Sequence, residues 1–289
     1  MISICIPTYN TDCTGLLKSL SKQIKSLDAI IEVIVFDDGS TLHQLSNKTV
    51  CNSMGFLHIE HKENLGRVAS RKKLAEMSKH QYLLFIDADM IPKNTTFLTK
   101  YHDFALTQAQ VVLGGYAYEK DGSNTNLLRY KYGIKREEKK AVIRTKRPFK
   151  NIYSGNVLIK KELFLKTNKV KNNRYGLDCV FSASLRNLKI IPIHIDNETY
   201  HNGIESNTEF LKKAREGVKT IAWLYQKNEI TYRDNGLVYV FNMIEKIGLV
   251  GIFKLIGQIA VKPVESLLSK NKAPLFLFDL YRLYHFAAG

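Results

Sequence analysis

Two aspartates with one residue between them, Asp87 and Asp89 on either side of Ala88, are the most informative side chains of this sequence. They directly follow the apolar run from Tyr82 to Ile86, which is typical of a buried strand. At a strand end, one carboxylate can accept a hydrogen bond from a hydroxyl group while the other coordinates a hard divalent cation, which prefers oxygen ligands. The spacing suits a site for a metal ion and a diphosphate, although two solvated aspartates that cap a helix have the same pattern.

Two further apolar runs, Ile2 to Ile6 and Ile30 to Phe36, also end in polar residues. Parallel strands bring their carboxyl ends to one edge of a sheet, where ligands bind, so these polar residues are expected to lie near the two aspartates. The first run leads into Pro7, Thr8, Tyr9 and Asn10, and the second into Asp37 and Asp38. Carboxylates there can accept a hydrogen bond from an imide N–H group or a ribose hydroxyl, although Asp-Gly also favours a plain turn.

The segments between these runs have helical spacing. Between the first two runs, apolar residues recur every three or four positions, as on one face of a helix: Leu16, Leu17, Leu20, Ile24 and Leu27. A strand at 56–59 and a helix at 68–77 continue the alternation, which predicts an α/β fold with a mostly parallel central sheet flanked by helices. The later part of the chain predicts a helix at 181–188, a strand at 189–195 and a helix at 208–225.

Four motifs follow one another along about the first 90 residues. They are Ser3-Ile4-Cys5-Ile6-Pro7-Thr8-Tyr9-Asn10, Phe36-Asp37-Asp38-Gly39-Ser40, Glu63-Asn64-Leu65-Gly66-Arg67 followed by Arg71, and Phe85-Ile86-Asp87-Ala88-Asp89. In order and separation they resemble the family 2 glycosyltransferases, and the resemblance continues more loosely to about residue 225. It implies the GT-A nucleotide-diphospho-sugar transferase fold with a helical C-terminal appendage.

The resemblance also implies a donor site. The nucleotide pocket would be lined by the first loop and by one acid that receives the base N–H group: Pro7, Thr8, Tyr9, Asn10, and Asp37 or Asp38. Gly66 would let the backbone come close, and Arg71 would lie near the diphosphate. Asp87, next to Ala88, would reach the ribose, and Asp89 would hold Mn²⁺ or Mg²⁺.

Two later segments also resemble parts of the family. Gly155-Asn156 is similar to the small-residue segment beneath the donor sugar, although a turn before the strand at 157–159 would have the same sequence. His201, which leaves a strand for a glycine-containing loop, is a candidate second ligand for the metal ion of Asp89. A lone histidine is also common as an ordinary core or surface residue.

Asp178 is the candidate general base. Many family members carry a Glu-Asp pair at the start of a helix in this region, whereas the segment from Arg174 to Phe181 has Asp178 as its one acid. A base in this position would take the proton of the acceptor hydroxyl. An aspartate at a helix start can also be a simple N-cap, and a single acid leaves open which member of the pair it matches.

The expected activity is that of an inverting glycosyltransferase. It would move a sugar from a nucleotide-diphospho-sugar, UDP-sugar first, to a hydroxyl group of a glycan or lipid-linked acceptor in polysaccharide biosynthesis. A sugar nucleotidyltransferase is the alternative enzyme, but it would carry a Gly-rich basic loop in place of Pro7 to Asn10. A non-enzymatic basic protein that binds membrane or nucleic acid is a third reading; no nucleic-acid partner is expected, because residues 120–174 contain no recognised module and few aromatics.

The formal net charge of +16 is concentrated in one part of the sequence. Residues 120–174 hold 17 Lys and Arg against 4 Asp and Glu, whereas residues 1–119 hold 12 of each. A basic stretch of this kind attracts polyanions such as phosphorylated acceptors or an anionic membrane surface. It can equally be a solvated basic face.

The sequence also predicts a division of the chain and a location. We expect a GT-A catalytic domain at 1–225, with nucleotide-sugar binding at 1–115 and the acceptor side and base at 116–225, and a helical C-terminal region at 226–289. The apolar segment Ile247 to Val261 is shorter than the ~20 residues of a spanning helix, which favours a packed or interfacial helix. Four widely spaced cysteines and no recognisable signal sequence predict a cytoplasmic protein with reduced thiols. The basic stretch together with this short apolar segment predicts peripheral attachment to the inner membrane, although both features can equally serve the fold.

Overall fold

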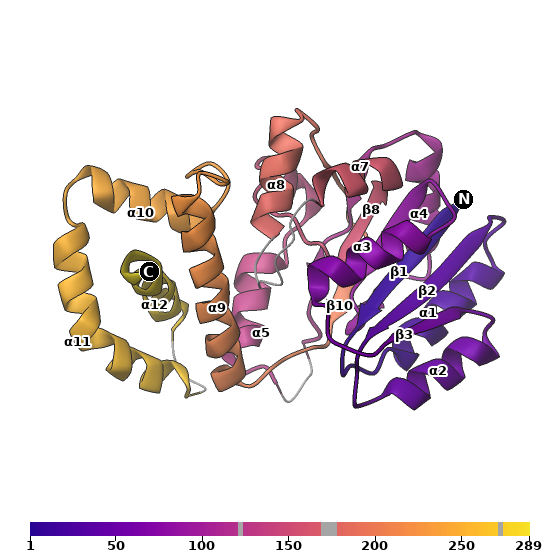
Figure 1. The fold of residues 1–289 in the computed structure, drawn as a ribbon, viewed down its shortest axis with the longest axis horizontal. Helices are drawn as coiled ribbons and strands as arrows, with labels where there is room; N and C mark the ends of the chain where they lie inside the picture. The colour runs from indigo at the N-terminus through magenta and orange to yellow at the C-terminus, as the bar shows by residue number, and fades with distance from the viewer. Residues whose placement is uncertain (121–123, 169–177, 271–273) are drawn as a thin grey trace. The chain divides into compact units, whose positions relative to one another are not determined.

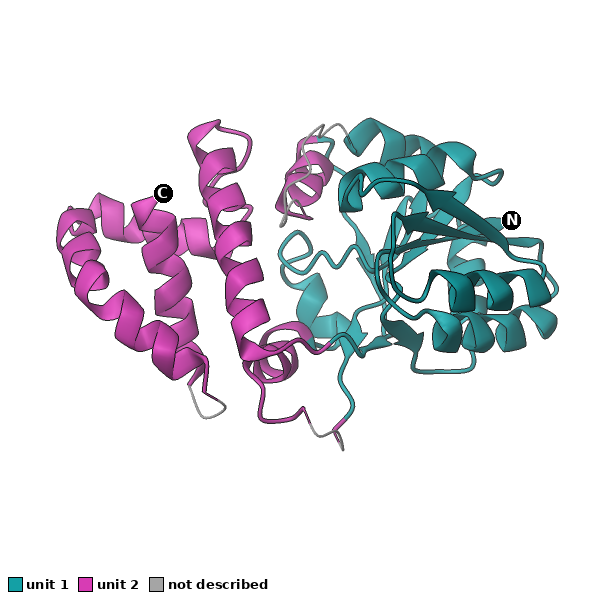
Figure 2. Ribbon diagram, turned by 60° about the horizontal axis from the view of Figure 1, so that its bottom comes forward, with its two compact units in different colours: residues 1–119, 138–173, 188–203 teal, residues 120–137, 174–187, 204–289 magenta. Residues whose placement is uncertain are grey.

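The computed structural model describes residues 1–120, 124–168, 178–270 and 274–289. The chain forms two compact units, each assembled from three separate stretches of sequence (Figure 2). The first unit comprises residues 1–119, 138–173 and 188–203, and the second comprises residues 120–137, 174–187 and 204–289.

A seven-stranded sheet in the order β3-β2-β1-β4-β8-β6-β9 forms the centre of the first unit (Figure 1). Its strands are β1 (Ile2–Thr8), β2 (Ile31–Asp38), β3 (Leu57–His61), β4 (Tyr82–Ile86), β6 (Val111–Leu113), β8 (Asn156–Lys160) and β9 (Ile193–His194). β8 is antiparallel to both of its neighbours, β4 and β6, whereas the other neighbouring strands are parallel. The mostly parallel central sheet predicted from the sequence is therefore confirmed.

Helices cover both faces of this sheet (Figure 1). They are α1 (Thr14–Lys25), α2 (Gln44–Ser53), α3 (Arg67–Met77), α4 (Phe97–Leu106), α6 (Ala141–Thr145) and α7 (Lys161–Thr167). α1 buries Leu16, Leu17 and Leu20, the apolar stripe expected from their spacing. α1 and α2 connect β1, β2 and β3, which lie in this order in one direction across the sheet. α3 connects β3 back to β4 on the other side of β1, so a right-handed crossover places α3 on the opposite face.

A second, three-stranded sheet in the order β5-β10-β7 lies in the same unit. Its strands are β5 (Met90–Pro92), β7 (Tyr116–Ala117) and β10 (Thr199–His201). β5 starts directly after Asp89, and its antiparallel pairing with β10 sets His201 opposite Met90. Two residues separated by more than a hundred positions in the sequence are thereby brought together.

Arg144 of α6 is fully buried in the first unit. Its guanidinium group donates to Nδ1 of His194 at 3.0 Å, so this histidine nitrogen carries no proton. The other donors reach, at 2.6–3.1 Å, the main-chain oxygens of Leu113, Gly114, Lys139 and Ile195. Arg129, in the second unit, is also buried and pairs with Glu137 at 3.0 Å. The basic stretch 120–174 thus contributes residues to both units and buries two of its arginines.

The second unit is helical. Its elements are α5 (Leu128–Tyr132), the π-helical turn η1 (Gly133–Glu137), α8 (Asp178–Asn187), α9 (Asn207–Gln226), α10 (Gly236–Lys246), α11 (Val250–Leu268) and α12 (Leu275–Ala288). α12 packs between α9, α10 and α11 (Figure 1). The core contains side chains from several of these helices: Leu128, Leu211, Leu268, Phe278 and Tyr281.

The later elements largely follow the sequence prediction. α8 and α9 match the helices expected at 181–188 and 208–225, but the strand expected at 189–195 is reduced to β9. Lys189 has φ +57°, a left-handed conformation that ends α8 in a turn and cannot continue an extended strand. α9 packs with the helices that follow it and belongs to the same unit. The predicted boundary at residue 225 separates a catalytic domain from a C-terminal region by function, and it stays a prediction.

Candidate active site

The loops after β1 and β2 are tied together by Asn10. Its side-chain oxygen accepts hydrogen bonds from the main-chain N–H groups of Thr41 at 2.7 Å and Leu42 at 3.0 Å. Its own N–H group donates to Oγ of Ser40 at 2.8 Å. Asn10 has φ +49°, a left-handed conformation that asparagine adopts more readily than most residues. Asn10 therefore shapes the edge of the predicted nucleotide pocket through the backbone.

The other residues of the first loop lie at the same edge. Thr8 is buried, and its hydroxyl group donates to the main-chain oxygen of Thr11 at 3.1 Å. Pro7 is half-buried, while Tyr9 is 50% exposed. Of the predicted lining residues, Tyr9 therefore offers the largest accessible apolar surface.

Asp37 and Asp38 have different partners. Both oxygens of Asp38 accept main-chain N–H groups, one from Leu65 and one from Gly66, each at 2.8 Å. Oδ1 of Asp37 accepts the N–H group of Ser40 at 2.7 Å. Its Oδ2 is buried and finds no hydrogen-bond partner among the residues that the structure describes. Asp38 thus fastens the loop before α3, and Asp37 keeps an acceptor.

Two glycines allow these loops to meet. Gly39 has φ +77°, and a Cβ atom there would come within 2.9 Å of the main-chain carbon of Glu63. Gly66 has φ +85° and directly precedes α3. α3 therefore starts at the carboxyl edge of the sheet, where the positive end of a helix favours anions.

Asp87 forms ion pairs with two arginines of α3. Nη2 of Arg67 lies 2.9 Å from Oδ2 of Asp87, and Arg71 pairs with Oδ1. Ser154 connects the same arginines, since its Oγ accepts from Arg67 at 2.9 Å and its main-chain oxygen accepts from Arg71 at 3.2 Å. Burial alone would raise the pKa of the Asp87 carboxyl group, but the charges of Arg67, Arg71 and His201 lower it below its ordinary value.

The Gly155-Asn156 segment supports Asp87 from β8. The main-chain oxygen of Gly155 accepts the N–H group of Asp87 at 3.1 Å, and a Cβ atom at Gly155 would come within 2.3 Å of Oδ2 of Asp87. Asn156 is fully buried. Its side chain bonds to the hydroxyl group of Tyr101 at 2.5 Å and to two main-chain oxygens, those of Gly115 and Asn197, at 2.8 and 2.9 Å. Contact of Asn156 with a donor stays a prediction, since these three bonds are internal.

The two predicted metal ligands lie close to each other. Nε2 of His201 is 3.6 Å from Oδ2 of Asp89. A Cβ atom at Gly203 would come within 2.0 Å of this oxygen, so only a residue without a side chain leaves it room. Among the described residues, no three His, Cys, Asp or Glu side chains form a group that could hold a metal ion. A pair of protein ligands nevertheless suits a hard cation that takes its other ligands from phosphate oxygens and water.

Asp178 belongs to the second unit, where it is the first residue of α8. Residues 174–177, which precede it in the predicted motif, lie outside the described part of the chain. At the other end of α8, Arg186 forms an ion pair with the buried carboxylate of Asp234 at 2.7 Å. That pair fixes α8 to the loop between α9 and α10.

Arg67 and Ser154 were not among the residues predicted from the sequence, although Arg67 ends one of its motifs. The signal for Arg67 was its spacing, since residues four apart lie on the same face of a helix and Arg71 is the fourth residue after it. Ser154 follows Tyr153, whose ring stacks on that of Tyr116 with centroids 4.7 Å apart. This contact joins segments distant in sequence, so no local pattern indicates it.

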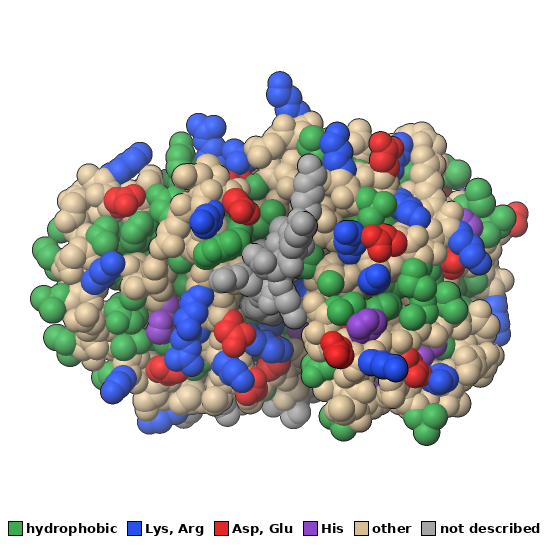
Figure 3. Space-filling model, in the orientation of Figure 1, with side chains coloured by type: hydrophobic (Ala, Val, Ile, Leu, Met, Phe, Trp, Pro, Cys, Tyr) green, Lys and Arg blue, Asp and Glu red, His purple; other side chains and the backbone are tan. Residues whose placement is uncertain are grey.

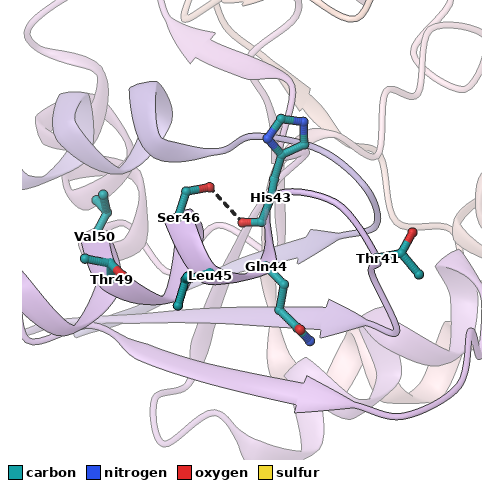
Figure 4. A pocket seen from close by; sticks show the side chains of 7 residues that line it. All are labelled: Thr41, His43, Gln44, Leu45, Ser46, Thr49 and Val50. Atoms are coloured by element: carbon teal, nitrogen blue, oxygen red, sulfur yellow. Dashed lines mark hydrogen bonds between the residues drawn. The ribbon is translucent and has the colours of Figure 1, made fainter.

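A separate hollow lies on the surface beside the start of α2 (Figure 4). It is lined by Thr41, His43, Gln44, Leu45, Ser46, Thr49 and Val50. Ser46 donates from its hydroxyl group to the main-chain oxygen of His43 at 2.9 Å. The residues predicted to bind the donor do not line this hollow.

The chain is similar to known proteins in both sequence and fold. Residues 3–167, more than half of the chain, match the family described as Glycosyl transferase family 2. Glycosyltransferase GlyG of Streptococcus pneumoniae is 30% identical over 138 residues, which are 46% of this chain and 44% of GlyG. The chain therefore spans less than half the length of this relative.

Two solved structures share the fold. The mannosyltransferase PcManGT of Pyrobaculum calidifontis, in complex with GDP-Man and Mn²⁺, is 16% identical with a TM-score of 0.54, covering 78% of this chain and 64% of its own. S. aureus TarS 1–349, in complex with UDP-GlcNAc, is 20% identical with a TM-score of 0.50, covering 75% and 65%. Both likenesses confirm the GT-A fold. On the match of residues 3–167, the chain belongs to the glycosyl transferase family 2.

Proposed function

We propose that this chain is an inverting glycosyltransferase that moves a sugar from a nucleoside diphosphate sugar to a hydroxyl group of a glycan or lipid-linked acceptor. The observation that carries the proposal is the divergence of the two aspartates after β4. Asp87 faces two arginines, whereas Asp89 faces His201. One carboxylate is thus placed among phosphate-binding cations and the other beside a metal-ligating side chain.

The donor side would bind the nucleotide through Asp37 and the diphosphate through α3. The buried Oδ2 of Asp37 would accept a ring N–H group of the base, which uracil and guanine both carry. UDP is the first candidate because the family resemblance leans to it. Arg67 and Arg71 would stabilise the negative charge that develops on the departing nucleoside diphosphate. Asp87 aligns both guanidinium groups and would reach the ribose.

Asp89 and His201 fit a Mn²⁺ or Mg²⁺ ion. Carboxylate oxygen and imidazole nitrogen are ligands for such ions, and the Asp89 side chain is 32% exposed, with Gly203 adding no side chain beside its Oδ2. The ion, when bound, would supply positive charge to the diphosphate. Other ligands would come from the donor and from water, as is usual for Mg²⁺ beside phosphates.

Asp178 would act as the general base of a single displacement. Its carboxylate takes the proton of the acceptor hydroxyl, the oxygen forms a bond to the anomeric carbon, and the bond from that carbon to the diphosphate breaks. A positioned base of this kind contributes ~10²–10⁴-fold to the rate. Its place at the start of α8, where many family members carry a Glu-Asp pair, supports the assignment.

We further propose that the protein acts in the cytoplasm, at the inner face of a membrane that carries its acceptor. The net charge of +16 supports attraction to an anionic surface.

Donor hydrolysis tests the proposed activity. The chain should release the nucleoside diphosphate from one member of a nucleotide-sugar panel in the presence of Mn²⁺, with UDP-sugars the first candidates. Release of pyrophosphate from a sugar phosphate and a nucleoside triphosphate would instead indicate a nucleotidyltransferase. No turnover of any donor, with or without added glycan acceptors, would contradict the proposal.

A further inference from the structure

The outer side of α10 and α11 is an exposed apolar surface. We use the name α10–α11 face for six of its side chains, which are 47–76% exposed: Tyr239, Met243, Ile252, Leu255, Ile256 and Ile259. Figure 3 shows hydrophobic side chains gathered at the left edge of the molecule, where α11 lies in the same orientation. Monomeric soluble proteins seldom expose apolar patches of this kind unless the patch binds something.

The packing of α11 fixes which of its sides faces outward. Gly257 lies against Tyr284 of α12 so closely that an added Cβ atom would come within 2.0 Å of the ring. Leu268 is fully buried in the core of the second unit, and Val261 and Val264 pack against that core. A rotation of α11 that hid its exposed isoleucines would break these contacts. The exposed side is therefore a stable feature of the fold.

The charged residues of α11 indicate what kind of partner covers it. Lys254, Gln258 and Lys262 are all exposed. They are spaced four residues apart, so they follow one another along one side of the helix, beside the apolar side chains. The one acid of α11, Glu265, has a partner within the unit, since its carboxylate lies 3.5 Å from Arg215. Long lysine side chains can lay their stems on an apolar layer and keep the ammonium group among anionic headgroups.

The length of the helices indicates how they would lie. Over the described residues, no single helix has both the length and the apolar character to cross a membrane. Within these residues, only α10 and α11 together have this length and apolar character, and the two helices are bent by 120° relative to each other. Lys254 and Lys262 fall within α11 itself, where a spanning helix would set them in the hydrocarbon. An amphipathic helix in the plane of the interface leaves both lysines at the headgroups.

We propose that the α10–α11 face binds the surface of an anionic lipid bilayer, with α11 lying in the interfacial plane. The inference rests on the proposed membrane location and names the surface that would make the contact. Vesicle binding tests it separately from the glycosyltransferase activity. The contact involves the C-terminal helices and does not require the basic stretch 120–174. Apolar burial supplies the adhesion, and Lys254 and Lys262 supply the preference for anionic lipid.

Flotation with vesicles tests the proposal. The full chain should float with vesicles of phosphatidylcholine and phosphatidylglycerol, and less with phosphatidylcholine alone. The double substitution Ile256→Gln/Ile259→Gln should lower the partition onto the anionic vesicles at least about tenfold. Leu45→Gln, which replaces a 77% exposed leucine of α2, is the matched control and should float like the unsubstituted chain. Lys254→Gln/Lys262→Gln should remove the preference for anionic lipid.

Two results would overturn the proposal. One is equal flotation of the Ile256→Gln/Ile259→Gln variant and the unsubstituted chain, or no flotation of either. The other is a dimer in sedimentation that this substitution converts to a monomer while neither form floats, because the face would then bind a second copy. Circular dichroism checks that the variants are folded, and hydrolysis of the nucleotide sugar in solution shows separately whether the proposed activity is intact.

Discussion

The carboxyl edge of the first unit and the α10–α11 face of the second unit hold opposite kinds of side chain in opposite surroundings. At the edge, two of the charged groups are withdrawn from water: the Arg71 side chain is 7% exposed and pairs with Asp87, and Asp38 is 4% exposed and binds two main-chain N–H groups. On the α10–α11 face, Ile256 and Ile259 are 60% and 76% exposed.

Substitutions in these two regions should therefore affect different properties of the protein. A buried polar group left without a partner costs about 1–3 kcal/mol, so the first unit depends on complete networks for both stability and chemistry. An exposed isoleucine loses little when it is replaced, so substitutions on the α10–α11 face should change binding and leave the fold intact.

Arg144→Met should have the largest effect, a loss of about 3–5 kcal/mol in the free energy of unfolding, because it removes all the hydrogen bonds that the buried guanidinium group donates to four main-chain oxygens and to His194. Denaturant unfolding measures it. Lys146→Met, an exposed residue of the same basic stretch, is the control and should stay within about 0.5 kcal/mol. A small loss for Arg144→Met would mean that the interior of the first unit is no more sensitive than its surface.

Asp178→Asn should lower the rate of sugar transfer at least ~10²-fold and leave donor affinity unchanged. Asparagine has nearly the size and shape of aspartate but cannot take up the proton, so the substitution separates the role of a base from a structural role at the helix start. Steady-state transfer and calorimetric titration with the nucleotide measure the two quantities. A variant that transfers at the original rate would show that the base lies elsewhere.

Asp89→Asn should remove the gain in nucleotide affinity that Mn²⁺ provides, by a factor of about ten or more, with thermal stability almost unchanged. Titration with UDP in the presence and absence of Mn²⁺ measures this gain. Asp103→Asn, on α4 with a side chain that is 68% exposed, is the matched control. Equal gains in both variants would refute the metal ligation.

The smallest expected effect is a dependence of stability on pH through His194. Burial lowers the pKa of this histidine below its ordinary value of 6.5, and the nearby charge of Arg144 adds to the effect. As the pH falls below 6.5, the unfolded chain takes up the proton before the folded chain does, so stability is full above pH 6.5 and decreases below it. Melting temperatures between pH 7.5 and 5 should show a shallower decline in His194→Gln. Identical profiles would exclude His194 as the cause.

Much of the first unit was predictable because its signals are local. β1, β2 and β4 are continuous apolar runs that end in polar residues, so both the parallel sheet and the edge with Asp87 follow from the sequence. His201 could be linked to Asp89 through the family resemblance, and the pairing of β5 with β10 brings the two side chains together.

The remainder depends on contacts that no local pattern records. Arg144 lies in the basic stretch, but its burial depends on carbonyl groups of Leu113, Gly114 and Ile195 that come from two other segments. Asp37 and Asp38 are adjacent and chemically identical, so only the approach of the loop at Leu65 and Gly66 shows that Asp38 is used structurally. The exposure of Ile256 is likewise decided by the packing of Gly257 against Tyr284.

Each unit is assembled from three separate stretches of sequence, and this affects how the chain can fold during synthesis. The chain leaves the first unit at residue 120, and Leu128 soon afterwards contributes to a core that also needs Leu268 and Phe278. The ribosome therefore releases α5 long before its packing partners exist. Domains ordinarily fold as units as they emerge, but here part of the second unit must wait while the first is completed. We expect chaperone dependence and aggregation of nascent chains to be greatest in that interval, and a truncation after residue 203 to leave Leu128 without its core.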